Sequence, residues 1–437
     1  MKIKDRLVKK SNIVWLPILV SSLLMSAPAF SGPLQDLYRL ALENDPQLKR
    51  AEAEFMAGQE APIQGKAALL PRVDFSASTS ESANSNGRTG YNVSLSQPVY
   101  ARAAYYNFRS SELSAEVSAL EFDKAQQDII LRSVQNYLEV LRTKSVLENA
   151  LAQERALQRR LDQVNAQFEV GLIAITDVQE AQATFDNAVV QRIDAEGALQ
   201  NSFEALERLT GQPFNQVGSL RAEYPIVAVE PADPSAWLEK ALEGNLELQI
   251  VELQVDSSRR NVQSKRSEHL PTVSVSLTHS NARPHGGNSN GWSDDNTLAL
   301  NLNLPLYRGD AINSAQRQAE HQYIATGHAL DDTQRAVTES TRTLLRTLQT
   351  SVQSVKAREQ SILSRETALR ATEEGFNVGT RNVVDVLQAE QALFEARLAY
   401  SNARIDHVNT LFRFKQTLGT LSPEDVTALD NWLLDRD

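Results

Sequence analysis

The sequence contains one motif twice, and the two copies lie almost half a chain apart. The first copy reads FEVGLIAITDVQ from Phe168, and the second reads FNVGTRNVVDVLQ from Phe376. Three identical pairs keep one constant offset: Phe168 with Phe376, Gly171 with Gly379, and Asp177 with Asp385. Internal repeats are a strong guide to architecture, because each copy predicts the same local structure. We therefore expect one structural unit that occurs twice in the 437-residue chain.

Shorter matches extend the repeat over most of the sequence. They are Leu70-Pro71 with Leu270-Pro271, Pro98-Val99-Tyr100 with Pro305-Leu306-Tyr307, and Gly211 with Gly419. Prolines cluster between the copies, at Pro213, Pro225, Pro231 and Pro234. We predict a signal peptide at 1–30, a first repeat at 31–215, a linker at 216–234, a second repeat at 235–420 and a C-terminal segment at 421–437. Each repeat is expected to hold a helix, two strands and a long helical hairpin.

The first residues of the chain predict a secretory signal peptide. The segment MKIKDRLVKK is basic, an apolar run follows from Ile13 to Met25, and small residues from Ser26 to Ser31 supply a cleavage site. The apolar run is too short to span a bilayer as a helix. The whole chain carries a net charge of −11, so nucleic acid is not an expected partner. The chain has no cysteine, which excludes both disulfide bonds and an N-terminal lipid on cysteine.

Four short segments alternate between apolar and small polar residues, two of them in each repeat. They are 73–80, 91–96, 273–277 and 298–304. A period of two with one apolar face predicts half-buried strands. After a signal peptide, such strands fit a membrane sheet with lipid on the apolar face and water on the other face. We assign four residues to the lipid face: Val93, Leu95, Leu300 and Leu302. The segments 81–89 and 281–296, rich in Asn, Gly and Ser, predict exposed loops.

Very long helices are predicted to follow the strands. No proline occurs from Ala101 to Gly211, and apolar residues recur at coiled-coil spacing. Examples are Leu157, Leu161 and Val164 in the first repeat, and Leu348, Val352 and Val355 in the second. A helix from Ala101 to Val170 would be about 105 Å long. Such a helix cannot fold over a compact core, so it must pack side by side with other long helices.

The repeated motif predicts the tip of a helical hairpin. Gly171 and Gly379 would end the long helices in a left-handed conformation, and the chain would re-enter a helix shortly afterwards. Two pairs of residues have the spacing of a capping box: Thr176 with Gln179, and Asp385 with Gln388. The repeated aspartates therefore have two interpretations, as helix caps or as charged groups of a functional site. The motif alone leaves both open.

The four strands of one chain are too few to close a membrane barrel, since the smallest such barrels have about eight strands. Unpaired strand edges are not tolerated in lipid, so several chains must contribute to one sheet. Two chains would give about eight strands and a filled interior, whereas three would give about twelve and room for a channel. Closed rings of identical subunits are the usual outcome of such pairing.

The sequence resembles the family of TolC outer-membrane channel-tunnels. The resemblance is carried by the two tip motifs, by the two Leu-Pro strand starts and by the ending LGTLSPED from Leu418 to Asp425. It implies an α+β membrane protein in which a homotrimer shares a twelve-stranded barrel in the outer membrane. It also implies an α-helical barrel in the periplasm and an equatorial collar built from 216–234 and 421–437. The implied partners are outer-membrane lipid, a periplasmic adaptor and an inner-membrane efflux pump or ABC transporter.

The resemblance also implies roles for residues at the hairpin tips. Arg381 would reach Thr176 and Asp177 of a neighbouring chain and hold the periplasmic entrance closed. Asp385 would contribute to a three-fold acidic ring at the narrowest point. The family often has a tyrosine where this chain has Phe376, and a second aspartate where it has Gln388. The expected function is an exit duct for multidrug efflux or type I protein secretion.

The residues bear on two other classes of function. A periplasmic coiled-coil adaptor or scaffold without a pore would also be secreted and helical, and it remains the alternative. An enzyme is not expected, because no nucleophile elbow or phosphate loop is present and the histidines form no metal motif. The six histidines are His269, His279, His285, His321, His328 and His407. No cofactor is expected. The sequence indicates neither the cargo nor a receptor role for the loop at 281–296.

Overall fold

The computed structural model describes residues 32–82, 85–285 and 291–434. The predicted signal peptide lies outside the described residues, as does part of the predicted loop at 281–296. The two repeats have the same succession of elements. The first contains α1 (Pro33–Asn44), α2 (Pro46–Gln59), α3 (Ala61–Ala67), β1 (Arg72–Ser82), β2 (Ser85–Tyr100), α4 (Arg102–Glu169) and α5 (Ile175–Thr210). The second contains α6 (Pro234–Gly244), α7 (Leu246–Ser267), β3 (Thr272–His285), β4 (Ser293–Asn303), α8 (Ala311–Asn377) and α9 (Val383–Thr417), and α10 (Pro423–Asp430) follows.

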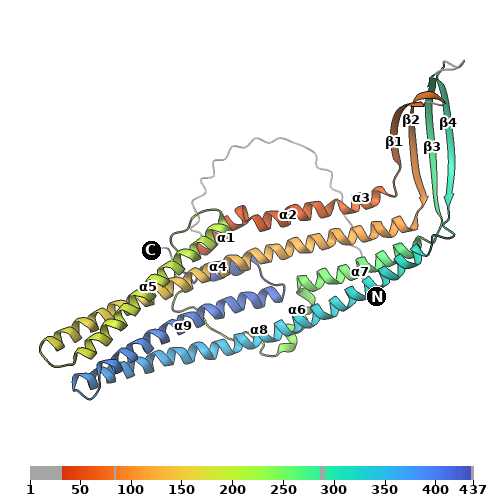
Figure 1. The fold of residues 1–437 in the computed structure, drawn as a ribbon. Helices are drawn as coiled ribbons and strands as arrows, with labels where there is room; N and C mark the ends of the chain where they lie inside the picture. Colours follow the sequence, from red (N-terminus) through yellow and green to blue (C-terminus); the bar gives the residue numbers. More distant parts are fainter. Residues whose placement is uncertain (1–31, 83–84, 286–290, 435–437) are drawn as a thin grey trace, which may run out of the picture. The chain divides into compact units, whose positions relative to one another are not determined.

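The four strands form one antiparallel sheet in the order β1-β2-β3-β4 (Figure 1). The pairing of β2 with β3 joins the strands of the two repeats, and both strands are longer than the sequence pattern predicts. The predicted loop at 81–89 is wrong in extent, because β2 begins at Ser85 and pairs with β1 almost to its start. The predicted loop at 281–296 is also too long, since β3 continues to His285 and β4 begins at Ser293.

One face of the sheet is apolar across all four strands. Residues directly opposite each other on paired strands share a face. Val73 pairs with Leu95, Leu95 with Leu277, and Leu277 with Leu298, which makes a continuous apolar row. Alternation along β2 and β4 places the remaining predicted lipid-facing residues on the same face: Val93, Leu300 and Leu302. The side chains of Leu300 and Leu302 are exposed.

The opposite face of the sheet is lined by small and polar side chains. Ser96 pairs with Ser276, and Ser276 pairs with Ala299. On the same face, Asn301 donates from its side-chain amide to the Ser276 hydroxyl over 3.1 Å. The sheet therefore separates an apolar surface from a polar one, as the alternation predicts.

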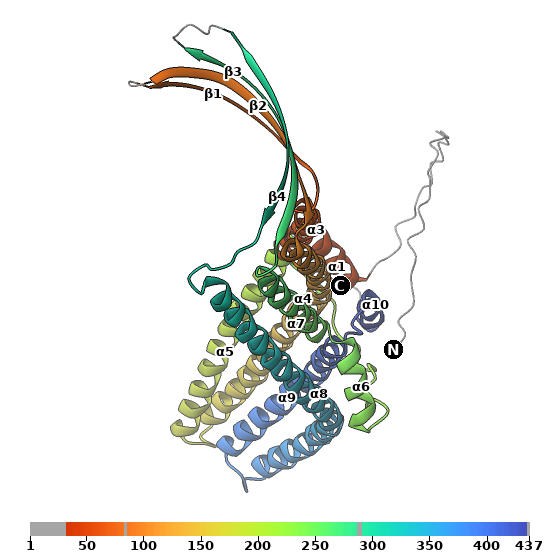
Figure 2. The same ribbon diagram turned by 90° about the vertical axis from the view of Figure 1, so that its right-hand side faces the viewer.

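The long helices follow directly from the strands, and each forms a hairpin with the helix after it (Figure 1). The helix α4 has 68 residues, so its length is about 102 Å. It runs from the lower end of β2 to the first tip, and α5 returns along it; α8 and α9 repeat this arrangement. The shorter α7 lies between α4 and α8 (Figure 2). No helix in the described ranges has a stretch that is apolar and long enough to cross a membrane.

The largest apolar core lies midway along the helices, where the two ends of the described chain meet. It includes Leu34 and Leu37 of α1, Tyr137 of α4, and Val426 and Leu429 of α10. A bridge between Leu220 and Leu433 attaches the linker to the C-terminal segment. The side chain of Asp430 accepts a hydrogen bond of 2.9 Å from the backbone N–H of Leu34 at the start of α1. These contacts bring the linker, α1 and α10 into one region.

We expect Leu300→Arg to impair insertion into the outer membrane, because the exposed Leu300 side chain lies on the apolar sheet face. An arginine facing lipid near the bilayer midplane destabilises a membrane strand by about 2–4 kcal/mol. The matched control is Asn301→Arg, one residue along the strand on the polar face. Membrane fractionation and heat-resistant oligomers on mild SDS gels measure the effect. Equal insertion of the two variants would show that Leu300 does not contact lipid.

Candidate functional site

The two hairpin tips have the same backbone conformation. Gly171 and Gly379 have φ of 76° and 77°, the left-handed values that the sequence predicts for helix-ending glycines. At the first tip the N–H of Leu172 donates to the carbonyl of Gln167 over 2.9 Å. At the second tip the N–H of Thr380 donates to the carbonyl of Gly375 over 2.8 Å. These bonds satisfy carbonyls that the helix end would otherwise leave free.

The helices after the tips begin differently from the prediction. The first residue of α5 follows Ala174, which has no side-chain oxygen, so Thr176 and Gln179 form no capping box. At α9 the box is formed by Asn382 and Asp385, and the predicted pair of Asp385 with Gln388 is wrong. The Asn382 side chain accepts from the Asp385 N–H over 2.8 Å. The Asp385 carboxylate accepts from the Asn382 N–H over 3.3 Å. Asp385 therefore serves as a helix cap in the single chain.

The predicted gating residues are divided between the two tips. In the second tip, Arg381 lies 3.8 Å from the Asp385 carboxylate, and its side chain is 61% exposed. Within one chain, the described residues show no bond from Arg381 to Thr176 or Asp177 of the first tip. Thr176 is exposed and Asp177 is half-buried in the first turn of α5. The structure thus leaves the Arg381 guanidinium accessible to another molecule.

An apolar cluster holds the two hairpins together just behind their tips. It consists of Leu157, Leu161 and Val164 from α4, Val178, Ala181 and Ala188 from α5, and Val383 and Leu387 from α9. Phe376, at the end of α8, packs against this cluster and is partly buried. Gln388, on the next turn of α9, is exposed. Phe376 therefore contributes an apolar contact at the end of α8.

A buried ionic cluster near the tips was not found by the sequence analysis. The Arg160 guanidinium of α4 donates to Glu373 of α8 over 2.6 Å and to Glu390 of α9 over 2.9 Å. Arg160 is 9% exposed and Glu390 is 7% exposed. Burial raises the pKa of the Glu390 carboxyl above its ordinary value, against the opposing effect of the Arg160 guanidinium. The cluster connects the first hairpin to both helices of the second.

The sequence carried one signal for this cluster. Glu390 interrupts an otherwise apolar stripe, because it lies at helical spacing between Val386 and Phe394, which are both buried. An acidic residue at such a position requires a cationic partner. The identity of that partner is long-range information, and Arg160 lies on a different hairpin.

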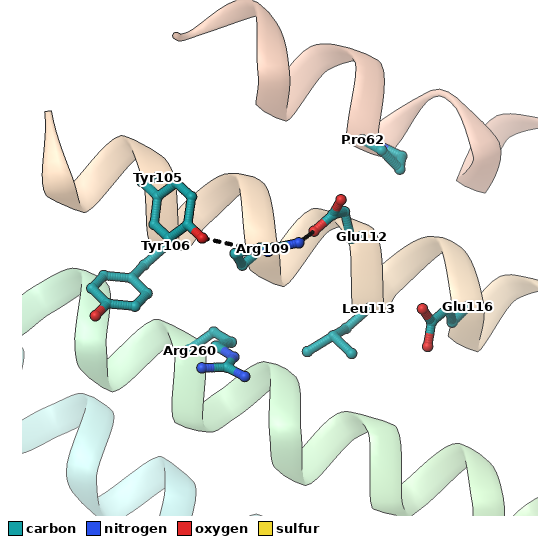
Figure 3. Close-up of a pocket in the computed structure, with 8 residues that line it drawn as sticks. All are labelled: Pro62, Tyr105, Tyr106, Arg109, Glu112, Leu113, Glu116 and Arg260. Atoms are coloured by element: carbon teal, nitrogen blue, oxygen red, sulfur yellow. Dashed lines mark hydrogen bonds and ion pairs between the residues drawn. The ribbon is translucent and has the colours of Figure 1, made fainter. Parts of the chain in front are cut away.

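A surface pocket of about 840 Å³ lies near the start of α4, at the end away from the tips, and Figure 3 shows the residues that line it. It is lined by residues of α3, α4 and α7, including Tyr105, Arg109 and Arg260. Arg109 donates to the Tyr105 hydroxyl over 3.1 Å and to the Glu112 carboxylate over 2.7 Å. These contacts pair three of the polar side chains that line the pocket with one another.

A histidine in the second hairpin also has a packing explanation. His407 of α9 is buried, and its Nδ1 lies 2.7 Å from the Ser351 hydroxyl of α8. Burial lowers the pKa of the His407 imidazole. A neutral imidazole that bonds across two packed helices is a structural contact. The described residues contain no group of histidine and acidic side chains arranged to bind a metal ion.

A comparison with protein families finds one that matches both repeats. The model described as "Outer membrane efflux protein" matches residues 37–212 and 237–420. The two stretches lie within the two repeats that the sequence predicts.

Individual proteins match over nearly the whole chain. The chain is 34% identical to the outer membrane protein TolC of Vibrio cholerae, with 94% of this chain and 96% of that protein covered. It is 30% identical to the alkaline protease secretion protein AprF of Pseudomonas aeruginosa, with 92% and 88% covered. The crystal structure of the outer membrane protein VceC from Vibrio cholerae aligns with a TM-score of 0.78 at 17% identity. That alignment covers 88% of this chain and 96% of VceC, and it shows a shared α+β channel fold.

We expect Gly379→Ala to lower the melting temperature of the protein. A left-handed conformation costs a residue with a Cβ about 1–2 kcal/mol, and no neighbouring side chain compensates at this exposed tip. Gly197→Ala is the matched control, because Gly197 lies inside α5 with open space around it. There alanine should stabilise the helix by about 1 kcal/mol. Thermal unfolding in detergent, followed by circular dichroism, measures the melting temperatures of both variants. Shifts of the two melting temperatures in the same direction would contradict the left-handed conformation of Gly379.

Proposed function

The chain belongs to the outer membrane efflux protein family and forms an exit duct in the outer membrane, and we propose that three copies build this duct. Its long helices form a tunnel in the periplasm. Membership of this family sets aside the alternative of a periplasmic adaptor without a pore. The main support for the proposed trimer is the four-stranded sheet. It has one apolar and one polar face, and its outer edges are β1 and β4.

The outer edges of the sheet favour assembly with further copies. A membrane sheet cannot leave backbone N–H and C=O groups of an edge strand exposed to lipid. Pairing β4 of one copy with β1 of the next satisfies both edges and closes a ring. Three copies give about twelve strands, enough for an open interior lined by the polar face. The proposed repeat limits, 31–215 and 235–420, give each repeat two of these strands and one hairpin.

The cargo and partners proposed here follow from the relatives. AprF is named for the secretion of alkaline protease, and the family is named for efflux. We propose that this duct serves type I secretion, efflux or both, together with a periplasmic adaptor and an inner-membrane pump or ABC transporter. The polar sheet face is permissive for chemically different cargo. Selection of cargo would then belong to the transporter.

The periplasmic gate is proposed to lie at the hairpin tips. Arg381 of one copy would bind Thr176 and Asp177 of its neighbour, drawing adjacent tips together. Its exposure supports this role, because its contact with Asp385 is long at 3.8 Å and leaves the guanidinium free to exchange partners. Phe376 lacks the hydroxyl that the family often has at this position. Arg381 would therefore carry more of the closure in this protein.

Asp385 is proposed to serve as a cap and as part of an acidic ring. Its side chain is 34% exposed although one oxygen accepts the Asn382 N–H. Three such carboxylates near a three-fold axis would attract cations. With a neutral Gln388 in the next turn, the ring would consist of one layer of carboxylates. Binding of multivalent cations should be correspondingly weaker than in a relative with two layers.

We expect Arg381→Ala to raise the single-channel conductance of the purified trimer in planar bilayers. An exposed ion link contributes at most about 1 kcal/mol, so its loss should shift the closed–open ratio by no more than about fivefold per link. Arg397→Ala is the control, because Arg397 pairs with Glu366 inside the second hairpin. Conductance equal to the parent in both variants would argue against the latch. If the parent protein forms no pores, the proposed assembly of three copies is wrong.

We expect Asp385→Asn to abolish block of the channel by divalent or trivalent cations added to the periplasmic side. Asparagine can still accept the Asn382 N–H, so the capping box and the fold should persist. Asp186→Asn is the control, since Asp186 is an exposed carboxylate of α5 with no place in the proposed ring or latch. Current is recorded against cation concentration. Block of the Asp385→Asn channel at the parental concentration would leave Asp385 with only its capping role.

A further inference from the structure

The apolar face of the sheet becomes polar toward the end of the sheet away from the helices (Figure 1). Residues opposite each other on paired strands share this face, so the register defines rows of side chains across it. One row is wholly apolar: Val73, Leu95, Leu277 and Leu298. The next row away from the helices is mixed: Phe75, Val93, His279 and Asn296.

The polar side chains on this face, from the mixed row to the far end of the sheet, form a continuous group that we name the outer patch. Glu81 follows a register shift in β1, but its contact with His285 places it on the same face. The members of the outer patch are Thr79, Glu81, Thr89, His279, Asn281, Arg283, His285, Asp294 and Asn296.

The outer patch lies at a height where the outer face of a membrane sheet is normally apolar. On β3 the apolar positions extend only from Val273 to Leu277, about 13 Å along the strand. The apolar band around a membrane barrel is about 25 Å tall. Since β2 and β3 are the inner strands of the sheet, further copies that pair at β1 and β4 leave their outer face uncovered. The polar groups therefore face the lipid leaflet farther from the periplasmic helices.

A chain of side-chain contacts holds one side of the outer patch in place. His285 Nδ1 lies 2.9 Å from the Glu81 carboxylate, and His285 Nε2 lies 2.8 Å from the Thr89 hydroxyl. The Thr89 hydroxyl lies 2.7 Å from the Thr79 hydroxyl. The chain crosses β2 at Gly87, where a Cβ would come within 2.8 Å of the Glu81 carboxylate. These side chains are therefore positioned before any ligand arrives.

Arg283 is the cation of the outer patch that lacks a partner in the described chain. It precedes His285 by one position on this face of β3, and its side chain is exposed. Within the described ranges its guanidinium has no ion pair or hydrogen bond, whereas Glu81 pairs with His285. The other carboxylate, Asp294, accepts from the Asn281 amide over 3.4 Å. An ionised side chain that faces lipid requires an opposite charge or a polar partner. The lipid itself must therefore supply an anionic group at this height.

We propose that the outer patch binds the phosphorylated sugar headgroup of a glycolipid in the outer leaflet, with Arg283 on a phosphate. The outer leaflet of an outer membrane consists largely of lipopolysaccharide, whose acylated disaccharide carries phosphates and hydroxyls next to its acyl chains. A guanidinium binds phosphate through two parallel hydrogen bonds. Imidazole, amide and hydroxyl side chains can donate to or accept from sugar hydroxyls. The apolar rows nearer the helices would contact the acyl chains of the same molecule.

The length of the outer patch favours a sugar headgroup over the headgroup of a glycerophospholipid. From His279 to His285 the patch extends about 20 Å along β3. A single phosphate near Arg283 would leave the polar groups at both ends of the patch facing hydrocarbon, which is unfavourable. A phosphorylated disaccharide, with further sugars attached, can reach the whole patch. The distribution of polar groups thus matches one lipid class of the outer membrane.

The experiment titrates the detergent-solubilised protein with fluorescently labelled lipopolysaccharide that lacks O-antigen, and fluorescence anisotropy gives the Kd. Arg283→Gln should raise the Kd at least about tenfold, because a charge-assisted contact with phosphate is lost. Arg283→Lys keeps the cation and should stay within about threefold of the parent. Arg88→Gln is the matched control, since Arg88 lies opposite Pro284 at nearly the same height but on the polar face. Its Kd should equal that of the parent.

Three results would overturn the proposal. One is an equal change of the Kd in Arg283→Gln and Arg88→Gln. Another is equal affinity for lipopolysaccharide from which a phosphatase has removed the phosphates. The third is competition by phosphatidylglycerol as effective as that by unlabelled lipopolysaccharide, which would assign the outer patch to a glycerophospholipid.

Single-channel conductance, recorded in parallel, separates this proposal from the proposed duct. Arg283→Gln should conduct like the parent, because Arg283 lies on the lipid side of the sheet. A parent channel that conducts but binds no lipopolysaccharide would contradict the outer patch as a binding site and leave the duct intact.

Discussion

The pairing of β2 with β3 is the interaction on which the arrangement of both repeats depends. The register places Leu95 opposite Leu277, so the apolar faces of the two repeats coincide. A slip of one residue would turn the apolar side of one repeat toward the polar side of the other. The same pairing brings the lower ends of β2 and β3 together. It therefore sets α4 and α7 side by side and determines which helices of the two hairpins meet.

The duplicated chain uses one backbone design for two chemically different tips. Both tips end a long helix with a left-handed glycine, and both place an aspartate in the first turn of the next helix. The residues around this frame differ, because Ala174 in the first repeat corresponds to Asn382 in the second. Arg160 likewise has Ala368 as its counterpart, and Glu390 has Gln182. Repetition thus supplies the geometry, whereas divergence between the copies supplies the polar contacts that join them.

The features predicted correctly from the sequence depend on local chemistry. The bounds of α4 follow from the absence of proline and from the glycine at its end, and the left-handed tips follow from glycine itself. The strand ends were missed because their cause is not local. Gly90 lies between the predicted loop at 81–89 and the predicted strand at 91–96, yet a Cβ there would lie 2.7 Å from the Asn281 carbonyl of β3. That glycine permits close approach of a strand from the other repeat, which no window of sequence around it reveals.

In the candidate site, too, local features could be predicted from the sequence and contacts between distant segments could not. The sequence predicts a capping role for Asp385 with Gln388 as its partner, whereas the side chain that completes the box is Asn382, which precedes it. The cluster around Arg160 required knowledge of which hairpins pack together, and its members come from three helices. An apolar stripe interrupted by a charge can show that a partner exists. Only the fold identifies that partner.

The contact between Asp430 and Leu34 has a consequence for the time order of folding. It joins residues 396 positions apart, and the surrounding core contains side chains from α1 and α10 together. Contacts between residues so far apart in the sequence form late in folding, because a long loop must first be closed at a cost in entropy. Residues of α10 are therefore needed to complete the core to which α1 contributes. A chain of which α10 has not yet been exported lacks that contact, so the core midway along the helices can reach its final packing only after α10 has arrived.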